Sequence, residues 1–169
     1  MNATQQRDQA CRLAKQDTYE ALARARQIQK PWFKAQALSW IARFTDGSPI
    51  GIAHEAMKAA KEGDDDYKKT AVRAWEIAAL AERGRQPEAR QALAEALTSS
   101  SSIAPLPSAA EALTLLLHAS FRLERKDVEL VAAQLKTTCG DSSHWRCTRA
   151  LGDADKLLSG KLEPRTFFW

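Results

Sequence analysis

The chain has 169 residues, a net charge of +4 and a pI near 9.1, which is a length typical of one domain with a mild basic excess. Its 31 Ala and 18 Leu against 3 Val and 6 Ile exclude a β-rich fold, because strands favour β-branched side chains and helices favour Ala and Leu. No apolar run reaches the roughly 20 residues of a membrane-spanning helix, and no apolar signal core follows Met1, so we expect a cytoplasmic protein.

Gly and Pro divide the chain into segments whose apolar residues lie three and four positions apart, the pattern of amphipathic helices. The predicted helices cover 4–15, 17–29, 31–44, 50–61, 67–83, 87–98, 108–123, 126–138 and 144–158. No Gly or Pro separates the first two, so residues 4–29 form either one helix or two. Asp17 with Glu20, and Ser108 with Glu111, predict helix caps. The Ser- and Pro-rich stretch 99–107 predicts a flexible loop.

Three of these helices share a pattern. Segment 34–42 lines up with 70–78 and with 109–117, and each is followed by a second helix with small apolar residues. These segments follow one another at offsets of 36 and 39 residues. A helix pair that repeats at this spacing buries its apolar stripe only by stacking on neighbouring pairs. We therefore predict an all-α fold, a right-handed α-solenoid of antiparallel helix pairs with about eight or nine helices, in a single domain over 1–169.

The run 25–42 (ARQIQKPWFKAQALSWIA) resembles the units of bacterial tetratricopeptide-like (TPR-like) repeat proteins, which read A-x-x-I, a short turn, then R/K-A-x-A-L-x-x-I-A. The second unit has Arg73 and Ala74 where Ala and Leu are expected, and the third has Leu116 and Leu117 in place of Ile-Ala. The resemblance covers roughly 14–138. It implies a fold and a tendency to bind proteins or peptides, and it implies no activity.

Catalytic motifs are absent from the sequence: it has no G-x-S-x-G, P-loop, G-x-G-x-x-G or H-E-x-x-H pattern. We therefore expect no enzyme activity and no cofactor. His54 and His118 stand alone on helical patterns. The acidic run 64–66 precedes a predicted helix start, where carboxylates complement the helix dipole.

One weak metal candidate consists of Cys139, His144 and Cys147, three potential ligands close in sequence. Zinc needs a fourth ligand, and the spacing is not that of a common zinc site. We favour the alternative without a metal, in which Cys139 ends one helix, Gly140 caps it and Cys147 packs on the next helix. A disulfide between the two cysteines is a further alternative. With only three cysteines, the sequence indicates a reducing compartment.

The resemblance implies that the first helix of each pair lines an inner groove, here helices 31–44, 67–83 and 108–123. The residues expected to bury are Ala35, Leu38, Ile41, Ala42, Ala71, Ala74, Ile77, Ala78, Ala110, Leu113, Leu116 and Leu117. The residues expected to line a peptide-binding groove are Gln36, Ser39, Arg43, Val72, Trp75, Ala79, Glu111, Thr114 and His118. Trp75 aligns with the small polar Ser39 and Thr114, so we expect it to be partly exposed and to anchor the peptide. The expected function is a non-catalytic scaffold that binds a protein or peptide, with no membrane partner.

Two alternatives stay open. Residues 1–45 carry eight Lys and Arg against three Asp and Glu, so a helical repeat could bind nucleic acid there. The candidate phosphate contacts are Arg7, Arg12, Lys15, Arg24, Arg26, Lys30, Lys34 and Arg43. A solvated helical surface explains this mild excess better, and nucleic acid is the less favoured partner.

The second alternative concerns the aromatic tail 161–169, which ends in Phe167, Phe168 and Trp169. We expect it to fold back as a cap on the apolar end of the repeat array. Otherwise it binds a partner protein or a second copy in a homodimer. Trp32, Phe33 and Phe44 are expected in the core.

Overall fold

The computed structural model describes residues 1–168, and within that range it consists of α-helices and loops without a β-strand. The helices are α1 (Ala3–Leu13), α2 (Thr18–Gln27), α3 (Pro31–Phe44), α4 (Ile50–Lys61), α5 (Asp66–Ala71), α6 (Arg73–Glu82), α7 (Gln86–Ser100), α8 (Leu106–Ser120), α9 (Arg125–Cys139) and α10 (Trp145–Leu158). None of these helices combines the length and the apolar character that crossing a bilayer requires.

The helix boundaries follow local capping chemistry. Residues 4–29 form two helices, because Asp17 is extended and its carboxylate accepts the Glu20 N–H at the start of α2. The predicted cap at Ser108 is wrong. Helix α8 already begins at Leu106, since Pro107 fits the first turn without a donor, and Ser108 lies inside the helix.

The predicted helix 67–83 is also corrected, because it is divided at Val72 into α5 and α6. The Val72 N–H lies a long 3.4 Å from the Lys68 carbonyl oxygen, and the Trp75 N–H donates to Val72 instead of to Ala71. The backbone hydrogen bonds there follow a tighter, 3₁₀-like turn. No Gly or Pro marks this site in the sequence, so helix propensity gave no sign of it.

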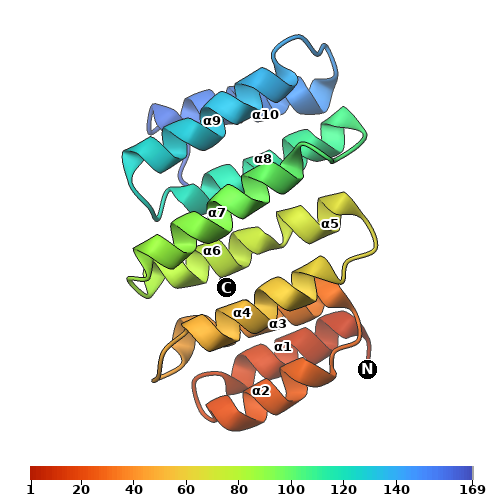
Figure 1. Ribbon diagram of the computed structural model, residues 1–169, viewed down its shortest axis with the longest axis vertical. Helices are drawn as coiled ribbons and strands as arrows, with labels where there is room; N and C mark the ends of the chain where they lie inside the picture. The colour runs from red at the N-terminus through yellow and green to blue at the C-terminus, as the bar shows by residue number, and fades with distance from the viewer. Residues whose placement is uncertain (169) are drawn as a thin grey trace.

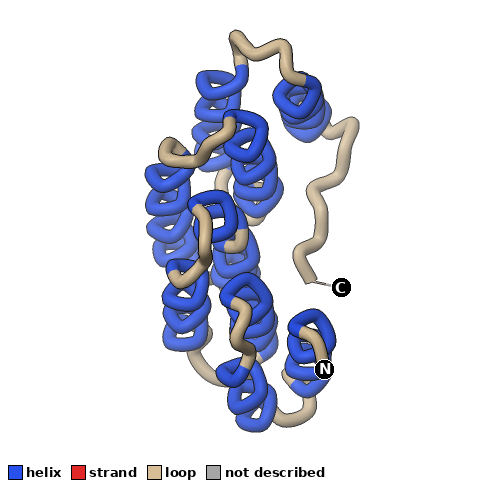
Figure 2. Tube along the Cα trace, turned by 90° about the vertical axis from the view of Figure 1, so that its right-hand side faces the viewer, coloured by secondary structure: helices blue, strands red, loops and turns tan. Residues whose placement is uncertain are grey.

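The helices form two layers (Figures 1 and 2). Helices α2, α4, α7 and α9 lie in front in Figure 1, and α3, α6 and α8 pack side by side behind them. Helices α1 and α10 contact the two ends of this second layer, at α3 and α8. Figure 2 shows residues 161–168 running back between α1 and α10. We call residues 161–168 the tail, and the side of α3, α6 and α8 on which it lies the inner face.

The core follows the predicted helical stripes. All twelve positions expected to bury on the first helices are buried, from Ala35 to Leu117. One continuous cluster of buried apolar side chains extends from Ala10 to Phe168. Many of its members are alanines, whose small side chains let helices approach closely without strain. The positions that the 3.6-residue period predicts are thus buried, but burial in α3 and α6 is not confined to one stripe, since residues 35–42 and 73–81 are buried throughout.

A buried ion pair lies between α4, α6 and α7, on the side away from the inner face. Arg73 donates to both carboxylate oxygens of Glu76, at 2.8 and 3.1 Å, and to Glu95 at 3.0 Å. Arg73 and Glu76 are each only 5% exposed. Burial raises the pKa of the Glu76 carboxyl, although the charge of Arg73 opposes the shift. The pair borders a cavity of about 250 Å³ that His54 and Met57 also line.

Replacing Glu76 by Ala should lower the free energy of unfolding by about 3 kcal/mol, because it leaves the Arg73 guanidinium buried with Glu95 alone. Urea denaturation followed by circular dichroism measures this change. The matched control is Arg73→Met/Glu76→Leu, which removes both charges together and should cost distinctly less. Equal losses in the two variants would contradict the assignment of the penalty to an uncompensated charge.

Candidate functional site

The tail binds to the inner face of its own chain. Residues 163–168 form no helix or strand, and they run past α8, α6 and α3 in that order. Lys161 to Thr166 stay largely exposed, whereas Phe167 is fully buried and Phe168 is 6% exposed. The tail therefore holds to the inner face mainly through its two phenylalanine rings. Trp169, the last residue of the predicted tail, lies outside the described residues.

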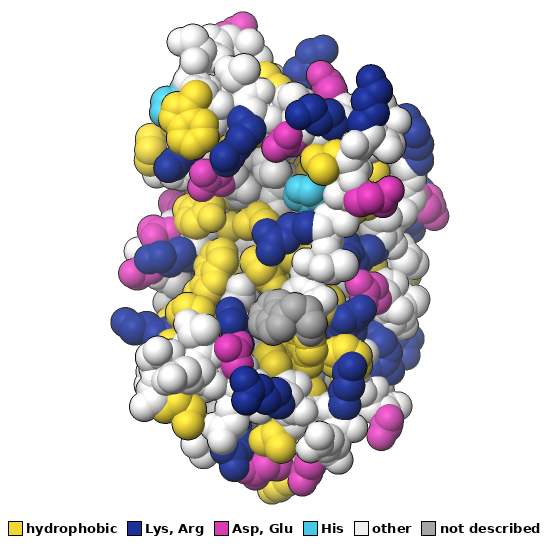
Figure 3. All heavy atoms as spheres, turned by 180° about the vertical axis from the view of Figure 1, so that it is seen from behind, with side chains coloured by type: hydrophobic (Ala, Val, Ile, Leu, Met, Phe, Trp, Pro, Cys, Tyr) yellow, Lys and Arg dark blue, Asp and Glu magenta, His cyan; other side chains and the backbone are white. Residues whose placement is uncertain are grey.

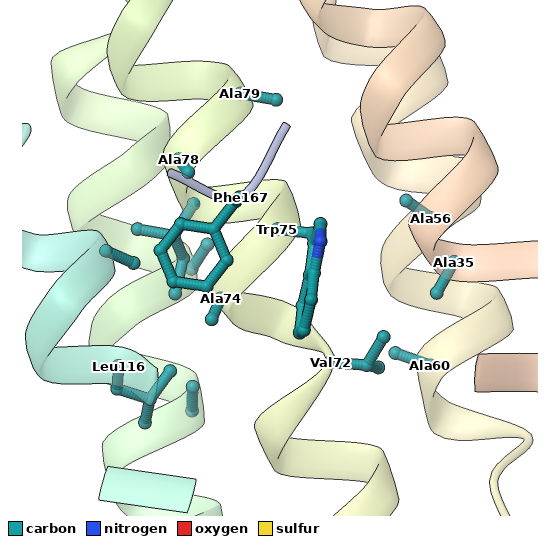
Figure 4. Packing of buried hydrophobic residues seen from close by; sticks show 14 of the residues in the cluster. Ala35, Ala56, Ala60, Val72, Ala74, Trp75, Ala78, Ala79, Leu116 and Phe167 are labelled. Carbon is teal, nitrogen blue, oxygen red and sulfur yellow. The ribbon is translucent and has the colours of Figure 1, made fainter. Parts of the chain in front are cut away.

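Two tryptophans of the inner face receive these rings. The Phe167 ring meets Trp75 of α6 edge to face, with centroids 5.1 Å apart, and Phe168 meets Trp40 of α3 in the same way at 5.6 Å. Figure 4 shows the Phe167 ring among Ala74, Ala78 and Leu116, with Trp75 at its side. Edge-to-face pairs at these distances add about 0.5–1.5 kcal/mol to the gain from burial.

Polar groups hold the tail backbone. The Arg165 N–H donates to Nδ1 of His118 at 3.1 Å, and Nη2 of Arg122 donates to the Arg165 carbonyl oxygen at 3.2 Å. Both partners come from the end of α8 or the turn after it. Burial, together with the charges of Arg165 and Arg122, lowers the pKa of His118, which keeps the imidazole neutral and able to accept at Nδ1.

Cations flank the two phenylalanine rings. The Arg43 guanidinium lies 4.5 Å from the centre of the Phe168 ring, and that of Arg122 lies 5.2 Å from the centre of Phe167. Both arginines also bind Glu82, the last residue of α6, Arg122 at 2.7 Å. The three charged residues lie where α3, α6 and α8 end, so these helix ends share one edge of the inner face.

The nine residues predicted to line a groove divide into two groups. Arg43, Glu111, Thr114 and His118 are partly exposed on the inner face or beside it, and Arg43 and His118 contact the tail. The other five are buried: Gln36, Ser39, Val72, Trp75 and Ala79. Ser39 donates to the Ala35 carbonyl oxygen, and Gln36 accepts from Arg7.

The expectation that Trp75 is partly exposed is wrong. Its side chain is 5% exposed, because Phe167 covers it on one side and Trp32 packs against it at 5.6 Å. The alignment with Ser39 and Thr114 was misleading. A large side chain at a position that holds a small one in the other units can still be buried when another segment, here the tail, covers it. Trp32, Phe33 and Phe44, expected in the core, are partly buried at its margin.

Sequence reasoning did not single out Trp40, Glu82 or Arg122 as site residues. Trp40 follows the helical period like any core residue, and Glu82 and Arg122 have the composition of an ordinary solvated surface. Besides the predicted groove residues Arg43, Trp75 and His118, the aromatic tail was a signal for this site, since three aromatics in a row are unusual on an exposed segment.

Two cavities share Tyr67 in their lining, and one of them borders the tail. One, of about 520 Å³, is lined by Trp32, Phe33 and Tyr67, with Trp32 and Tyr67 stacked at 6.2 Å. The other, of about 370 Å³, lies between α5, α8, α10 and the tail and has several charged side chains. Figure 3 shows this side of the molecule, with apolar side chains gathered near its middle and Lys and Arg around them.

The weak metal candidate is not brought together as a ligand set. Cys139 ends α9 and is buried against Cys147 of α10, and both thiols are free. His144 is instead exposed, and its Nδ1 accepts the Arg146 N–H at the start of α10. Within residues 1–168, no three His, Cys, Asp or Glu side chains are placed to hold a metal ion. Burial, together with the hydrogen bond to Cys147, raises the pKa of Cys139 to about 12.

Docking of the tail should weaken in acid because of His118. The pKa of His118 is lower in the folded state than in the unfolded chain. As the pH drops below about 6.5, the unfolded chain therefore binds a proton before the folded state does, and the free energy of unfolding decreases. His118→Asn offers Oδ1 as a replacement acceptor that does not titrate, and it should lose this part of the pH dependence. Unfolding free energies of both proteins between about pH 5 and pH 7.5 measure the difference. Parallel curves would argue against the role of His118.

No family model, no curated protein and no solved structure matches the chain.

Proposed function

We propose that the chain is a non-catalytic, TPR-like repeat module that binds an extended peptide segment of a partner protein on its inner face. In this proposal the antiparallel helix pairs form a right-handed superhelix, and the protein works as a cytoplasmic scaffold. The three aligned segments support the repeat arrangement, because they fall in α3, α5–α6 and α8, which pack in that order. The three free, buried cysteines agree with a reducing compartment.

The observation that carries the proposal is the tail itself. An irregular segment of the chain lies across the inner face with two aromatic side chains inserted and its backbone bonded by His118 and Arg122. These are the contacts that a peptide in a recognition site makes: aromatic anchors, and hydrogen bonds to the main chain. The tail therefore serves as a template of the ligand, and we infer a partner segment with two adjacent aromatic residues.

Nucleic acid is a less suitable partner for the basic N-terminal quarter. Four of its eight candidate phosphate contacts are already paired with carboxylates: Arg7 with Asp8, Arg24 with Glu20, Arg26 with Glu55 and Arg43 with Glu82. The Lys15 ammonium lies 4.5 Å from the centre of the Phe44 ring. Because the carboxylates would repel phosphates at these positions, this surface favours the protein partner.

A peptide supplied in trans tests the proposal. A fluorescent peptide with the sequence of residues 161–168 should bind the full-length variant Phe167→Ala/Phe168→Ala saturably, because that variant's own tail has lost its anchors. It should bind the wild-type protein roughly tenfold more weakly or worse, since the intact tail competes at a high effective concentration. Fluorescence anisotropy measures both affinities.

The control peptide carries Ala at both phenylalanine positions and should not bind. Circular dichroism verifies that the double variant stays helical, and the single variant Phe168→Ala serves if the double variant does not fold. A helical variant that fails to bind the aromatic peptide would refute the proposal.

A further inference from the structure

The cavity of about 370 Å³ beside the tail collects three arginines from two parts of the chain. Arg146 and Arg149 lie three positions apart in α10, hence on the same side of that helix. Arg165 comes from the tail, which has brought it across to α10 by docking on the inner face. The cavity exists in this form only because the tail is docked.

The side chains of these three arginines donate no hydrogen bond to any residue in 1–168. Arg146 and Arg149 have only Glu111, at 3.4 and 3.8 Å, too far or too poorly aligned for a hydrogen bond, and Arg165 has no carboxylate within ion-pair distance in that range. Most other arginines in the described chain do donate, as Arg73 and Arg83 do. Arg12 and Arg85 are the other exceptions within 1–168, and neither lines this cavity.

The guanidinium groups nonetheless lie against aromatic rings. Those of Arg146 and Arg149 lie 5.3 and 5.0 Å from the Trp145 ring, and that of Arg165 lies 5.5 Å from Trp75 and 5.2 Å from Phe167. Partial loss of water against these rings lowers the pKa of Arg165. Positioned guanidinium groups with unused N–H donors are the arrangement that recognises carboxylates and phosphates.

The other residues that line the cavity limit the class of ligand that it can bind. Glu111 and Asp153 supply two carboxylates against the three cations, which leaves one positive charge in excess. Leu115, Ala150 and the ring of Tyr67 add an apolar part to the wall. The volume is that of a small-molecule site and exceeds the size of a lone oxyanion.

We propose that this cavity binds an oxyanion, a phosphate or a carboxylate group, carried on a small apolar body. The oxyanion lies among Arg146, Arg149 and Arg165, and the apolar body covers Leu115 and Ala150. Bound there, the ligand joins α10 to the tail. The site forms with the tail docked, so its test needs no partner peptide. A peptide that displaces the tail from the inner face also removes Arg165 from the cavity.

Isothermal titration calorimetry of the full-length protein at low salt tests the site with three probes: inorganic phosphate, phenyl phosphate and benzoate. Saturable one-to-one binding of phenyl phosphate or of benzoate supports the proposal, and the tighter of the two identifies the oxyanion. Heats of dilution alone from all three probes would overturn it. Inorganic phosphate that binds as tightly as phenyl phosphate would overturn the apolar part of the site.

Variants with opposite effects locate the binding. Arg149→Gln should weaken binding of the better probe roughly tenfold, because it removes a charged donor pair. Glu111→Gln should strengthen binding several-fold, since Glu111 competes with the ligand for Arg146 and Arg149. Arg12→Gln, which removes an equally unbonded arginine from α1, is the matched control and should change nothing. If Arg149→Gln and Glu111→Gln bind the probe with the same affinity as Arg12→Gln, the probe binds at another place on the protein and this site is refuted.

Discussion

Close packing of α3, α6 and α8 over alanine is the constraint on which the rest of the structure depends. Ala37, Ala42, Ala74, Ala78 and Ala110 are all fully buried in these three helices. Small side chains let the helices approach closely, and on the inner face Ala74 and Ala78 leave space that the Phe167 ring fills. The tail in this way covers Trp75 with Phe167 and Trp40 with Phe168.

Those parts of the fold could be predicted in which the burial of a residue depends on its position along its own helix. The stripes from Ala35 to Leu117 are buried as the 3.6-residue period predicts. The period did not show that residues 35–42 and 73–81 are buried on every side of α3 and α6. The division at Val72 and the early start of α8 at Leu106 could not be predicted in this way. Both depend on how a helix meets its neighbours, and the local sequence shows neither a breaker at 72 nor a standard cap at 105.

The candidate site was predictable only in part, for a related reason. Arg43, Trp75 and His118 were expected on one face from the resemblance to TPR-like units, and all three contact the tail. The exposure of Trp75 was misjudged because its cover comes from a segment far away in the chain. The cluster of Arg146, Arg149 and Arg165 had no sequence signal, since it forms only when the path of the tail after α10 is known.

Glu82 has a consequence beyond charge balance. Its carboxylate is shared by Arg43 and Arg122, and each of these arginines lies over a different phenylalanine of the tail. A ring that leaves the inner face frees its arginine to move, and the shared carboxylate transmits that loss of order to the other arginine. We therefore expect the two aromatic contacts to be thermodynamically coupled through the Glu82 carboxylate. The tail should accordingly attach and detach as a single cooperative unit, without a long-lived half-bound state.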